Sequence, residues 1–385
     1  MAHALVFGAS GLTGWGVVDQ LLSNYPAEGT FAKVTALVNR PLAVAKSYWP
    51  SPSQSRPRLN LVSNVNLAEG TVEGFTALLK GKVEDVADVT HAFYFALKPE
   101  QDADAEVAVN RGMLERAIGA LNRVSPKLRF VVFPSGTKAY GIHIPGGVFT
   151  APFRESMGRL PEPAGSTVFY YEFQDILKEQ SKGRDWTWCD VRPDAVIGFV
   201  PNGSAFNLAA HWANYLLTYA LVEGKGAKVP FPGTQSAYSA LYNEASADII
   251  ARFSIWAALH PDKAGGGQIF NIADQTMPSR MSERWPALAK YFELEGIGPV
   301  DDPKVLRPGE YMNKHRGVLE KHGIRNNQVF KADFLDTYGY YLTSDRQLSL
   351  DKVRVAGFSE ETDPTSSWYK AFDRFRMAGM IPKSA

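Results

Sequence analysis

The chain has 385 residues, of which 45% are hydrophobic and 21% are charged, and 41 Lys and Arg residues balance 40 Asp and Glu residues. This composition is typical of a globular protein and excludes a disordered, collagen-like or coiled-coil chain. A formal net charge of +1 without long blocks of one sign gives no broad attraction to phosphate backbones or anionic lipids, so neither nucleic acid nor a membrane is expected as a partner.

The cysteine content and the first residues bear on the compartment. Cys189 is the single cysteine, which excludes an internal disulfide and a multi-cysteine metal site and suits a reducing environment. A strand is predicted almost at once, over residues 4–7, so no signal or transit peptide is expected. The apolar stretch 205–222 contains polar residues and predicts a buried helix, not a membrane span. We therefore expect a cytoplasmic protein.

Short apolar runs alternate with amphipathic segments in the first half of the chain. Strands are predicted over 4–7, 34–38, 59–62, 89–96, 129–133 and 187–191, and helices over 14–22, 72–79, 107–121 and 168–180. Continuous apolar strands separated by helices are typical of a parallel sheet that is covered on both faces. The pattern predicts an α/β fold with a Rossmann-type doubly wound parallel sheet.

The alternation weakens after residue 193. Helices are predicted over 207–222 and 245–259 and a strand over 268–272, and the remainder to 382 reads as mostly helical or irregular. We predict an NADP-binding Rossmann domain over 1–200 and a smaller mixed, mostly helical substrate-binding or lid region over 201–385. In an alternative arrangement, some elements between about 235 and 275 return to the main sheet.

A glycine-rich loop, Gly8-Ala9-Ser10-Gly11-Leu12-Thr13-Gly14, separates the first strand from the first helix. Glycines at this spacing permit a tight turn and a close approach of the backbone to a pyrophosphate, and the helix N-terminus attracts the anion. A turn that is merely tight would not need three of them. The loop therefore predicts dinucleotide binding.

The end of the second strand bears on the choice of cofactor. A carboxylate there would accept a hydrogen bond from the ribose of NAD, whereas Asn39 and Arg40 offer an amide and a guanidinium, which suit a 2′-phosphate. NADPH is the predicted cofactor, and the alternative for Arg40 is a solvated loop residue.

Two segments carry the residues that could perform chemistry. Ser135 and Lys138 follow the strand that ends at residue 133, and a later helix opens with Tyr170 and Tyr171. The Tyr-x-x-x-Lys pair of short-chain dehydrogenases is missing, because Gln174 and Asp175 stand four residues after the two tyrosines.

These features together resemble the progesterone 5β-reductase/iridoid synthase-like family, extended short-chain dehydrogenases that reduce enones and enals with NADPH. The matching segments run nearly end to end: the glycine loop, Asn39-Arg40-Pro41, 89–94, 135–140, Phe169-Tyr170-Tyr171, Arg192-Pro193-x-x-Val196-x-Gly198, 255–258 and Phe270-Asn271. The resemblance implies that Lys138 is the family's displaced catalytic lysine and Tyr170 its tyrosine, with Tyr171 the alternative if the register is off by one.

Conjugate reduction explains why such a pair is needed. Hydride addition to the β-carbon builds negative charge on the carbonyl oxygen, so the site needs a donor aimed at that oxygen. A tyrosine hydroxyl supplies the donor, and a nearby ammonium group stabilises the charge and is expected to lower the pKa of the tyrosine. The alternatives are aromatic packing for Tyr170 and Tyr171 and a surface turn for Lys138.

The resemblance also implies a set of cofactor contacts: Gly8, Ser10, Gly11, Leu12, Thr13, Gly14, Asn39, Arg40, Asn64, Val65, Ala96, Ser135, Tyr170, Val196 and Ser204. Asn64 stands where the family usually has an aspartate near the adenine, and Ala96-Leu97 replaces a Thr-Trp type pair, which should widen the pocket and make it more apolar. Further candidates for the pocket wall, with core packing as the alternative, are Phe206, Trp212, Tyr215 and Tyr340.

The expected function is NADPH-dependent reduction of the C=C bond of an α,β-unsaturated carbonyl compound, on a small hydrophobic substrate of secondary metabolism. The alternatives are a carbonyl reductase or a redox-neutral isomerase or cyclase on the same scaffold, and a dinucleotide sensor resembling the NmrA-like proteins. No metal is expected, since the histidines are scattered. No motif bears on assembly, which leaves a homodimer open.

Overall fold

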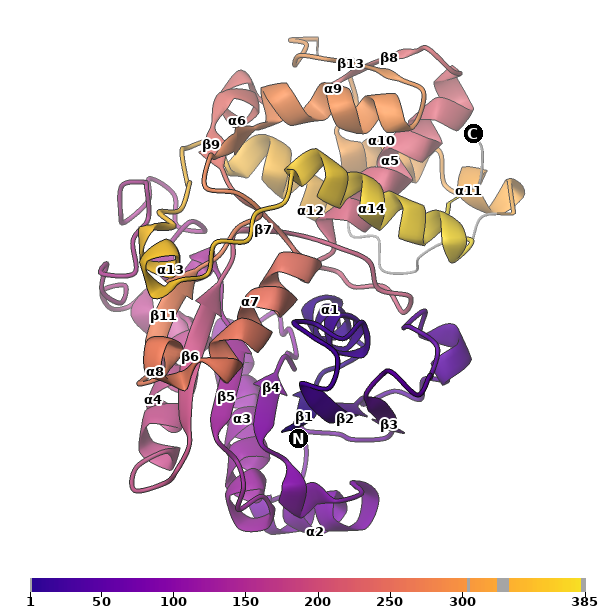
Figure 1. Cartoon of the computed structure of the whole chain (residues 1–385). Coiled ribbons are helices and arrows are strands. Elements are labelled where there is room, and N and C mark those ends of the chain that lie inside the picture. Colours follow the sequence, from indigo (N-terminus) through magenta and orange to yellow (C-terminus); the bar gives the residue numbers. More distant parts are fainter. Residues whose placement is uncertain (1, 303–304, 324–331, 382–385) are drawn as a thin grey trace.

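A seven-stranded parallel sheet forms the lower half of the protein in a computed structural model that describes residues 2–302, 305–323 and 332–381 (Figure 1). Its spatial order is β11 (Gln268–Asn271), β6 (Thr187–Arg192), β5 (Phe130–Pro134), β4 (His91–Tyr94), β1 (Ala2–Phe7), β2 (Phe31–Leu37) and β3 (Arg58–Val62). Every neighbouring pair is parallel, which confirms the predicted doubly wound sheet.

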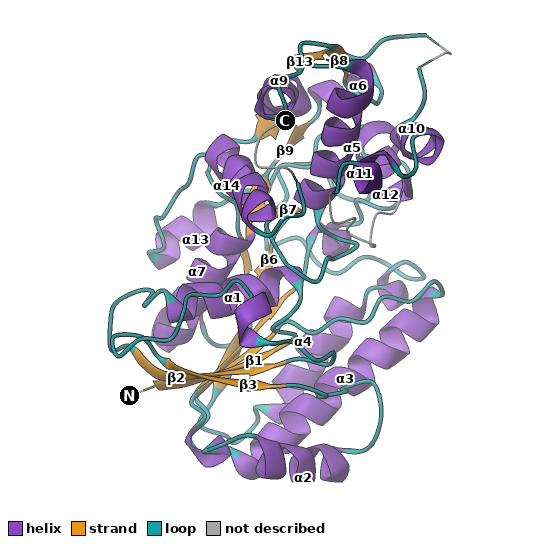
Figure 2. Cartoon of the chain, turned by 90° about the vertical axis from the view of Figure 1, so that its right-hand side faces the viewer, coloured by secondary structure: helices purple, strands orange, loops and turns teal. Residues whose placement is uncertain are grey.

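Helices cover both faces of this sheet (Figure 2). On one face lie α1 (Leu12–Leu22) and α7 (Ala247–Leu259), and on the other lie α2 (Val72–Lys82), α3 (Ala103–Val124) and α4 (Phe169–Gln180). The alternation along β1 shows why: Ala4 and Val6 join the core beneath α1, while Leu5 and Phe7 join the core beneath α3. A strand buried on both faces reads as a continuous apolar run.

One predicted strand is shorter than expected. The apolar run 89–96 forms a strand only over His91–Tyr94, and Phe95 and Ala96 lie beyond it on the wall of a cavity. The Phe95 N–H still donates to the Phe7 backbone oxygen on β1 at 3.0 Å, but both residues line the cavity.

The second region lies above the carboxyl ends of the strands (Figure 1). Its helices are α5 (Leu208–Glu223), α6 (Gln235–Ser239), α9 (Met281–Tyr291), α10 (Pro308–Lys314), α11 (Val318–Lys321), α12 (Ala332–Asp336), α13 (Asp351–Ala356) and α14 (Pro364–Met377). Three two-stranded sheets join β7 (Ala195–Ile197) to β10 (Glu244–Ser246), β9 (Leu241–Tyr242) to β12 (Ser279–Arg280), and β8 (Lys228–Pro230) to β13 (Glu295–Ile297).

The chain returns to the main sheet after this region begins. Strand β11 pairs with β6, and the short helix α8 (Pro261–Ala264) connects α7 to it. The boundary at residue 200 stays a prediction, and residue 382, where the helical or irregular remainder was expected to end, lies outside the described residues. In the described part of the chain, no helix combines the length and apolar character of a membrane span.

Candidate functional site

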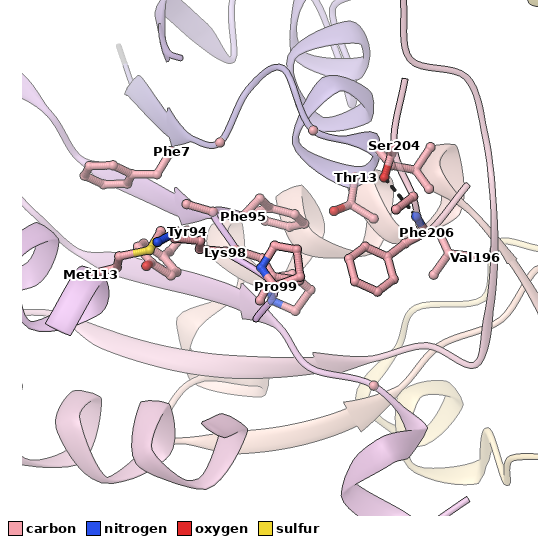
Figure 3. Close-up of a pocket in the computed structure, with 18 of the residues that line it drawn as sticks. Phe7, Thr13, Tyr94, Phe95, Lys98, Pro99, Met113, Val196, Ser204 and Phe206 are labelled. Atoms are coloured by element: carbon pink, nitrogen blue, oxygen red, sulfur yellow. Dashed lines mark hydrogen bonds between the residues drawn. The ribbon is translucent and has the colours of Figure 1, made fainter. Parts of the chain in front are cut away.

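A cavity of about 920 Å³ lies at the carboxyl ends of the strands, where the strand order reverses between β1 and β4. Open α/β sheets bind ligands at this point. Figure 3 shows part of the wall, with Thr13, Phe95 and Phe206 around the cavity. The predicted cofactor residues that line it are Gly8, Ser10, Gly11, Leu12, Thr13, Asn39, Arg40, Val65, Ala96, Ser135, Tyr170, Val196 and Ser204.

The glycine loop forms one end of the cavity. Gly8 has a φ of +72°, and a Cβ built on it would lie 2.5 Å from the Phe95 backbone oxygen. A Cβ on Gly14 would lie 2.3 Å from the Gly8 oxygen, so Gly14 packs beneath the loop and does not line the cavity. The N-cap residue of α1 is Gly11, which has no side chain to cap the helix, and the first turn contains no acidic residue. The resulting cradle, with uncapped N–H groups, fits the phosphates of a dinucleotide.

The residues that follow β2 and β3 lie at the same end of the cavity as the glycine loop. Asn39 and Arg40 are exposed on the cavity wall, and nothing in the described ranges forms a hydrogen bond or ion pair with the Arg40 side chain. Asn64 is exposed at a left-handed turn (φ 59°) and does not line the cavity, although its neighbour Val65 does. A direct contact from Asn64 to the adenine therefore stays a prediction without geometric support.

Lys138 also lies on the cavity wall, after β5, which is separated by β4 and β1 from the strands β2 and β3. The chain leaves β5 through an extended Gly136 and enters the 3₁₀ turn η3 (Thr137–Tyr140), which carries the lysine. Its Nζ lies 3.1 Å from Oε2 of Glu106 on α3 and 5.9 Å from the centre of the Phe169 ring. The ammonium group is thus held in a partly buried ion pair, with 31% of the lysine side chain exposed.

Tyr170 lines the same cavity from the first turn of α4. A Cβ built on Gly136 would lie 3.4 Å from its hydroxyl oxygen, so the absence of a side chain there leaves space beside the hydroxyl. Burial raises the pKa of Tyr170, the carboxylates of Asp190 and Glu106 raise it further, and the Arg192 guanidinium opposes them. The pKa is raised, so the expectation that the Lys138 ammonium group lowers it is wrong. The phenol stays protonated at neutral pH and can donate a hydrogen bond.

Tyr171 has a different environment. Its hydroxyl donates to the Ala139 backbone oxygen at 2.9 Å and accepts from the Leu160 N–H at 3.0 Å, and it does not line the cavity. Of the two candidate tyrosines, only Tyr170 faces the space that Lys138 also faces.

The position on α4 where a Tyr-x-x-x-Lys pair would have its lysine belongs to a buried hydrogen-bond network. Gln174, four residues after Tyr170, donates from Nε2 to Oδ2 of Asp190 at 3.0 Å. The Arg192 guanidinium pairs with the same oxygen at 3.0 Å, and the Ser135 hydroxyl donates to Asp190 Oδ1. Ser135 thus lines the cavity while its hydroxyl is tied to the core, and α4 offers an amide where a Tyr-x-x-x-Lys pair would have a cation.

The aromatic candidates separate into wall and core. Phe206 lines the cavity, whereas Trp212 and Tyr215 are buried in the core of the upper region. The Arg307 guanidinium carbon lies over the ring of Tyr340, 4.4 Å from the centre of that ring.

Several residues of the site had no signal in the sequence. Glu106, Asp194, Phe334 and Tyr338 either line the cavity or contact a residue that does. They come from segments far apart in the chain and belong to no local motif, so only their packing identifies them. Within the residues that are described, no group of three or more His, Cys, Asp or Glu side chains could hold a metal ion.

Comparisons with known proteins agree with this architecture. A family model described as "PRISE-like Rossmann-fold domain" matches residues 4–382. The Aspergillus calidoustus protein named short chain dehydrogenase ausT is 34% identical, over 98% of this chain and 94% of its own length. The Arabidopsis thaliana 3-oxo-Delta(4,5)-steroid 5-beta-reductase is 27% identical, over 98% of this chain and 93% of its own.

Solved structures show the same fold. The Bordetella bronchiseptica enzyme WbmH, solved in complex with NAD+, is 15% identical with a TM-score of 0.59, over 98% of this chain and all of its own.

Proposed function

The chain belongs to the family of PRISE-like Rossmann-fold proteins, which are oxidoreductases of the short-chain dehydrogenase/reductase type, and we propose that it is an NADPH-dependent reductase of the C=C bond in α,β-unsaturated carbonyl compounds. One observation carries the proposal: Lys138 and Tyr170 line the cavity that also contains the glycine cradle. In the described part of the chain no hydrogen bond engages the Tyr170 hydroxyl, which leaves it available to a ligand.

The cofactor proposal follows from the other end of the cavity. The cradle at Gly8–Gly11 and the start of α1 would hold the pyrophosphate, and Arg40 would pair with a 2′-phosphate. Bound NADPH would supply the hydride.

The protein's own groups would stabilise the charge that forms on the substrate. The Tyr170 hydroxyl would donate a hydrogen bond to the carbonyl oxygen, and its raised pKa keeps the proton in place until negative charge builds up. The Lys138 ammonium would add an electrostatic contribution, in an orientation set by Glu106. Phe206 and Phe334 provide apolar wall that would exclude water and favour a hydrophobic substrate.

The relative that is named a steroid 5-beta-reductase supports this reading, because its name describes reduction of a steroid with a 3-oxo-Delta(4,5) enone. The named fungal short chain dehydrogenase is compatible with a role in secondary metabolism.

The test incubates the purified protein with NADPH, and separately with NADH, and a panel of small enones, enals and their saturated ketone and aldehyde counterparts. We expect consumption of NADPH with the unsaturated compounds and products that keep the carbonyl group. Reduction of only the saturated carbonyls, products of unchanged mass, or tight NADPH binding without turnover on any compound would each overturn the proposal.

A further inference from the structure

A polar cluster of four side chains adjoins the reactive end of the cavity: Thr137, Asp194, Tyr338 and Arg346. Asp194 and Tyr338 line the cavity. Asp194 Oδ1 accepts a hydrogen bond from the Thr137 hydroxyl at 2.8 Å, and Oδ2 lies 3.3 Å from Nε of Arg346. The side chains of this ion pair are only 4% and 5% exposed.

This pair is incompletely hydrogen-bonded. Among the described residues, neither Asp194 Oδ2 nor Arg346 Nε has a hydrogen-bond partner of acceptable geometry. The guanidinium instead lies between aromatic rings, 4.9 Å from the centre of Tyr242 and 5.8 Å from that of Tyr338. Both atoms are buried and face each other, so the acceptor capacity that the carboxylate keeps for a ligand lies on the side of Asp194 that lines the cavity.

Tyr338 adds a second polar group to the same wall. It lies in a single π-helical turn, η5 (Thr337–Tyr341), and such turns are frequent at functional sites. No described residue forms a hydrogen bond with its hydroxyl. The nearby Asp194 carboxylate adds to burial in raising the pKa of Tyr338, which keeps this phenol a donor.

The cluster adjoins the predicted catalytic tyrosine. The Thr137 N–H donates to the Pro193 backbone oxygen at 3.2 Å. That oxygen and the Tyr170 hydroxyl lie 3.7 Å and 3.4 Å from the position of a Cβ on Gly136. Asp194, the next residue after Pro193, is therefore close enough to contact a substrate whose carbonyl lies at Tyr170.

We propose that Asp194 and Tyr338 form a subsite for a hydroxyl group of the substrate, separate from the reacting carbonyl. The inference rests on the proposed function and narrows its substrate class to hydrophobic hydroxy-enones and hydroxy-enals. The substrate hydroxyl would donate a hydrogen bond to Asp194 and accept one from Tyr338. A single hydroxyl group can do both at once.

The charges of the ion pair argue against an ionised group in this subsite. The ion pair is neutral overall, so a substrate ammonium would be attracted by Asp194 but opposed by Arg346. A carboxylate would be repelled by Asp194, whose side chain is only 4% exposed, so water screens its charge little. A neutral hydroxyl pairs with both wall groups without adding a charge.

The test uses straight-chain 2-enals that end in a hydroxyl, a methoxy or a methyl group, at three chain lengths, with NADPH. At the length that fits, kcat/KM for the hydroxy compound should exceed that for the other two by at least about tenfold. Tyr338→Phe and Asp194→Asn should each reduce this ratio while the methyl compound is still reduced. Tyr341→Phe is the matched control, because Tyr341 lies in the same turn and is 70% exposed.

Two outcomes would overturn the subsite. One is that wild-type protein shows no preference for the hydroxyl at any length, and the other is that the preference persists in every variant that folds. Asp194→Asn breaks a buried ion pair and can unfold the protein, so the folded Tyr338→Phe variant keeps the test decisive.

Binding of the same compounds to the protein–NADP+ complex, followed by fluorescence, gives the comparison without turnover. A hydroxyl preference in binding without any reduction would contradict the proposed function and support the subsite. Reduction without a hydroxyl preference would support the proposed function and contradict the subsite.

Discussion

The Tyr171 hydroxyl donates a hydrogen bond to the Ala139 backbone oxygen at 2.9 Å, so this side chain anchors α4 to the turn that carries Lys138. Its neighbour Tyr170 instead faces the cavity. Consecutive residues of a helix point about 100° apart, which is why two adjacent tyrosines have separate roles: one supports the turn and the other is available to a ligand.

Replacing each tyrosine should separate these roles. We expect Tyr170→Phe to lower kcat about 10²- to 10³-fold, because the donor to the developing oxyanion is lost, with NADPH affinity nearly unchanged. Tyr171→Phe should lower the free energy of unfolding by about 1–2 kcal/mol and leave kcat within a few-fold. Steady-state kinetics and urea denaturation measure both, and equal losses of kcat in the two variants would contradict the assignment.

The ion pair between Lys138 and Glu106 should position the ammonium group. In Glu106→Gln the amide can still accept a hydrogen bond but no longer attracts the cation, so we expect kcat to fall about three- to tenfold with little change in KM. Lys138→Met should show a larger loss. The control is Glu115→Gln, which removes an exposed pair with Arg111 on the same helix. A Glu106→Gln variant with wild-type kcat would show that the pair is only structural.

The space beside the Tyr170 hydroxyl can be filled selectively. Gly136 has an extended backbone that any residue adopts, so Gly136→Ala should fold normally and place a methyl group 3.4 Å from that oxygen. We expect KM for the enone to rise and kcat to fall, so that kcat/KM falls about tenfold, because the substrate carbonyl has less space. Gly158→Ala, whose Cβ would meet nothing within 4 Å, is the control. Faster turnover after Gly136→Ala would contradict this use of the space.

Arg40 should control the preference for NADPH. Removing the guanidinium in Arg40→Ala should weaken NADPH binding by about ten- to a hundredfold, the range for a charge-assisted hydrogen bond, and should leave NADH binding unchanged. Titration of intrinsic fluorescence with each dinucleotide measures this. Lys46→Ala removes an exposed cation nearby that does not line the cavity. Equal weakening of both dinucleotides would point to a lost fold and not to a lost phosphate contact.

A buried carboxyl group should make stability depend on pH. Asp274 is fully buried and its Oδ1 accepts from the Ser246 N–H at 2.8 Å, at the start of α7. Burial raises the pKa of Asp274 to about 7, and the Ser246 hydrogen bonds oppose this. Between roughly pH 4 and pH 7 the folded state therefore holds a proton that the unfolded state has released, so the stability that this proton contributes is lost as the pH rises.

The comparison with Asp274→Asn isolates this group. The neutral amide does not titrate, so the difference in free energy of unfolding between the two proteins should change by up to ~4 kcal/mol between about pH 4 and pH 8, in the direction that favours wild type at low pH. The difference cancels the opposite contributions of His3 and His91, whose pKa burial lowers to about 4. Urea denaturation over this range measures it, and a constant difference would contradict the raised pKa.

Much of the architecture follows from local patterns. Apolar runs predicted the parallel strands, and the spacing of Gly8, Gly11 and Gly14 predicted the cradle, because strand burial and close backbone approach restrict residue types at each position. The strand predicted over 89–96 was too long at its carboxyl end, because the sequence does not distinguish an apolar residue on a cavity wall from one in a strand.

The environment of each candidate side chain could not be read in this way. Helical periodicity predicts that Tyr170 and Tyr171 point about 100° apart, but only the packing of α4 against η3 shows which of them faces the cavity and which supports the turn. Glu106 meets Lys138, and Asp194 meets Arg346, across long stretches of chain. Such pairs depend on how helices and loops that are distant in the sequence come together at the carboxyl ends of the strands. Periodicity along the chain carries no information about that approach, because it records which face of an element is buried and not what lies opposite it.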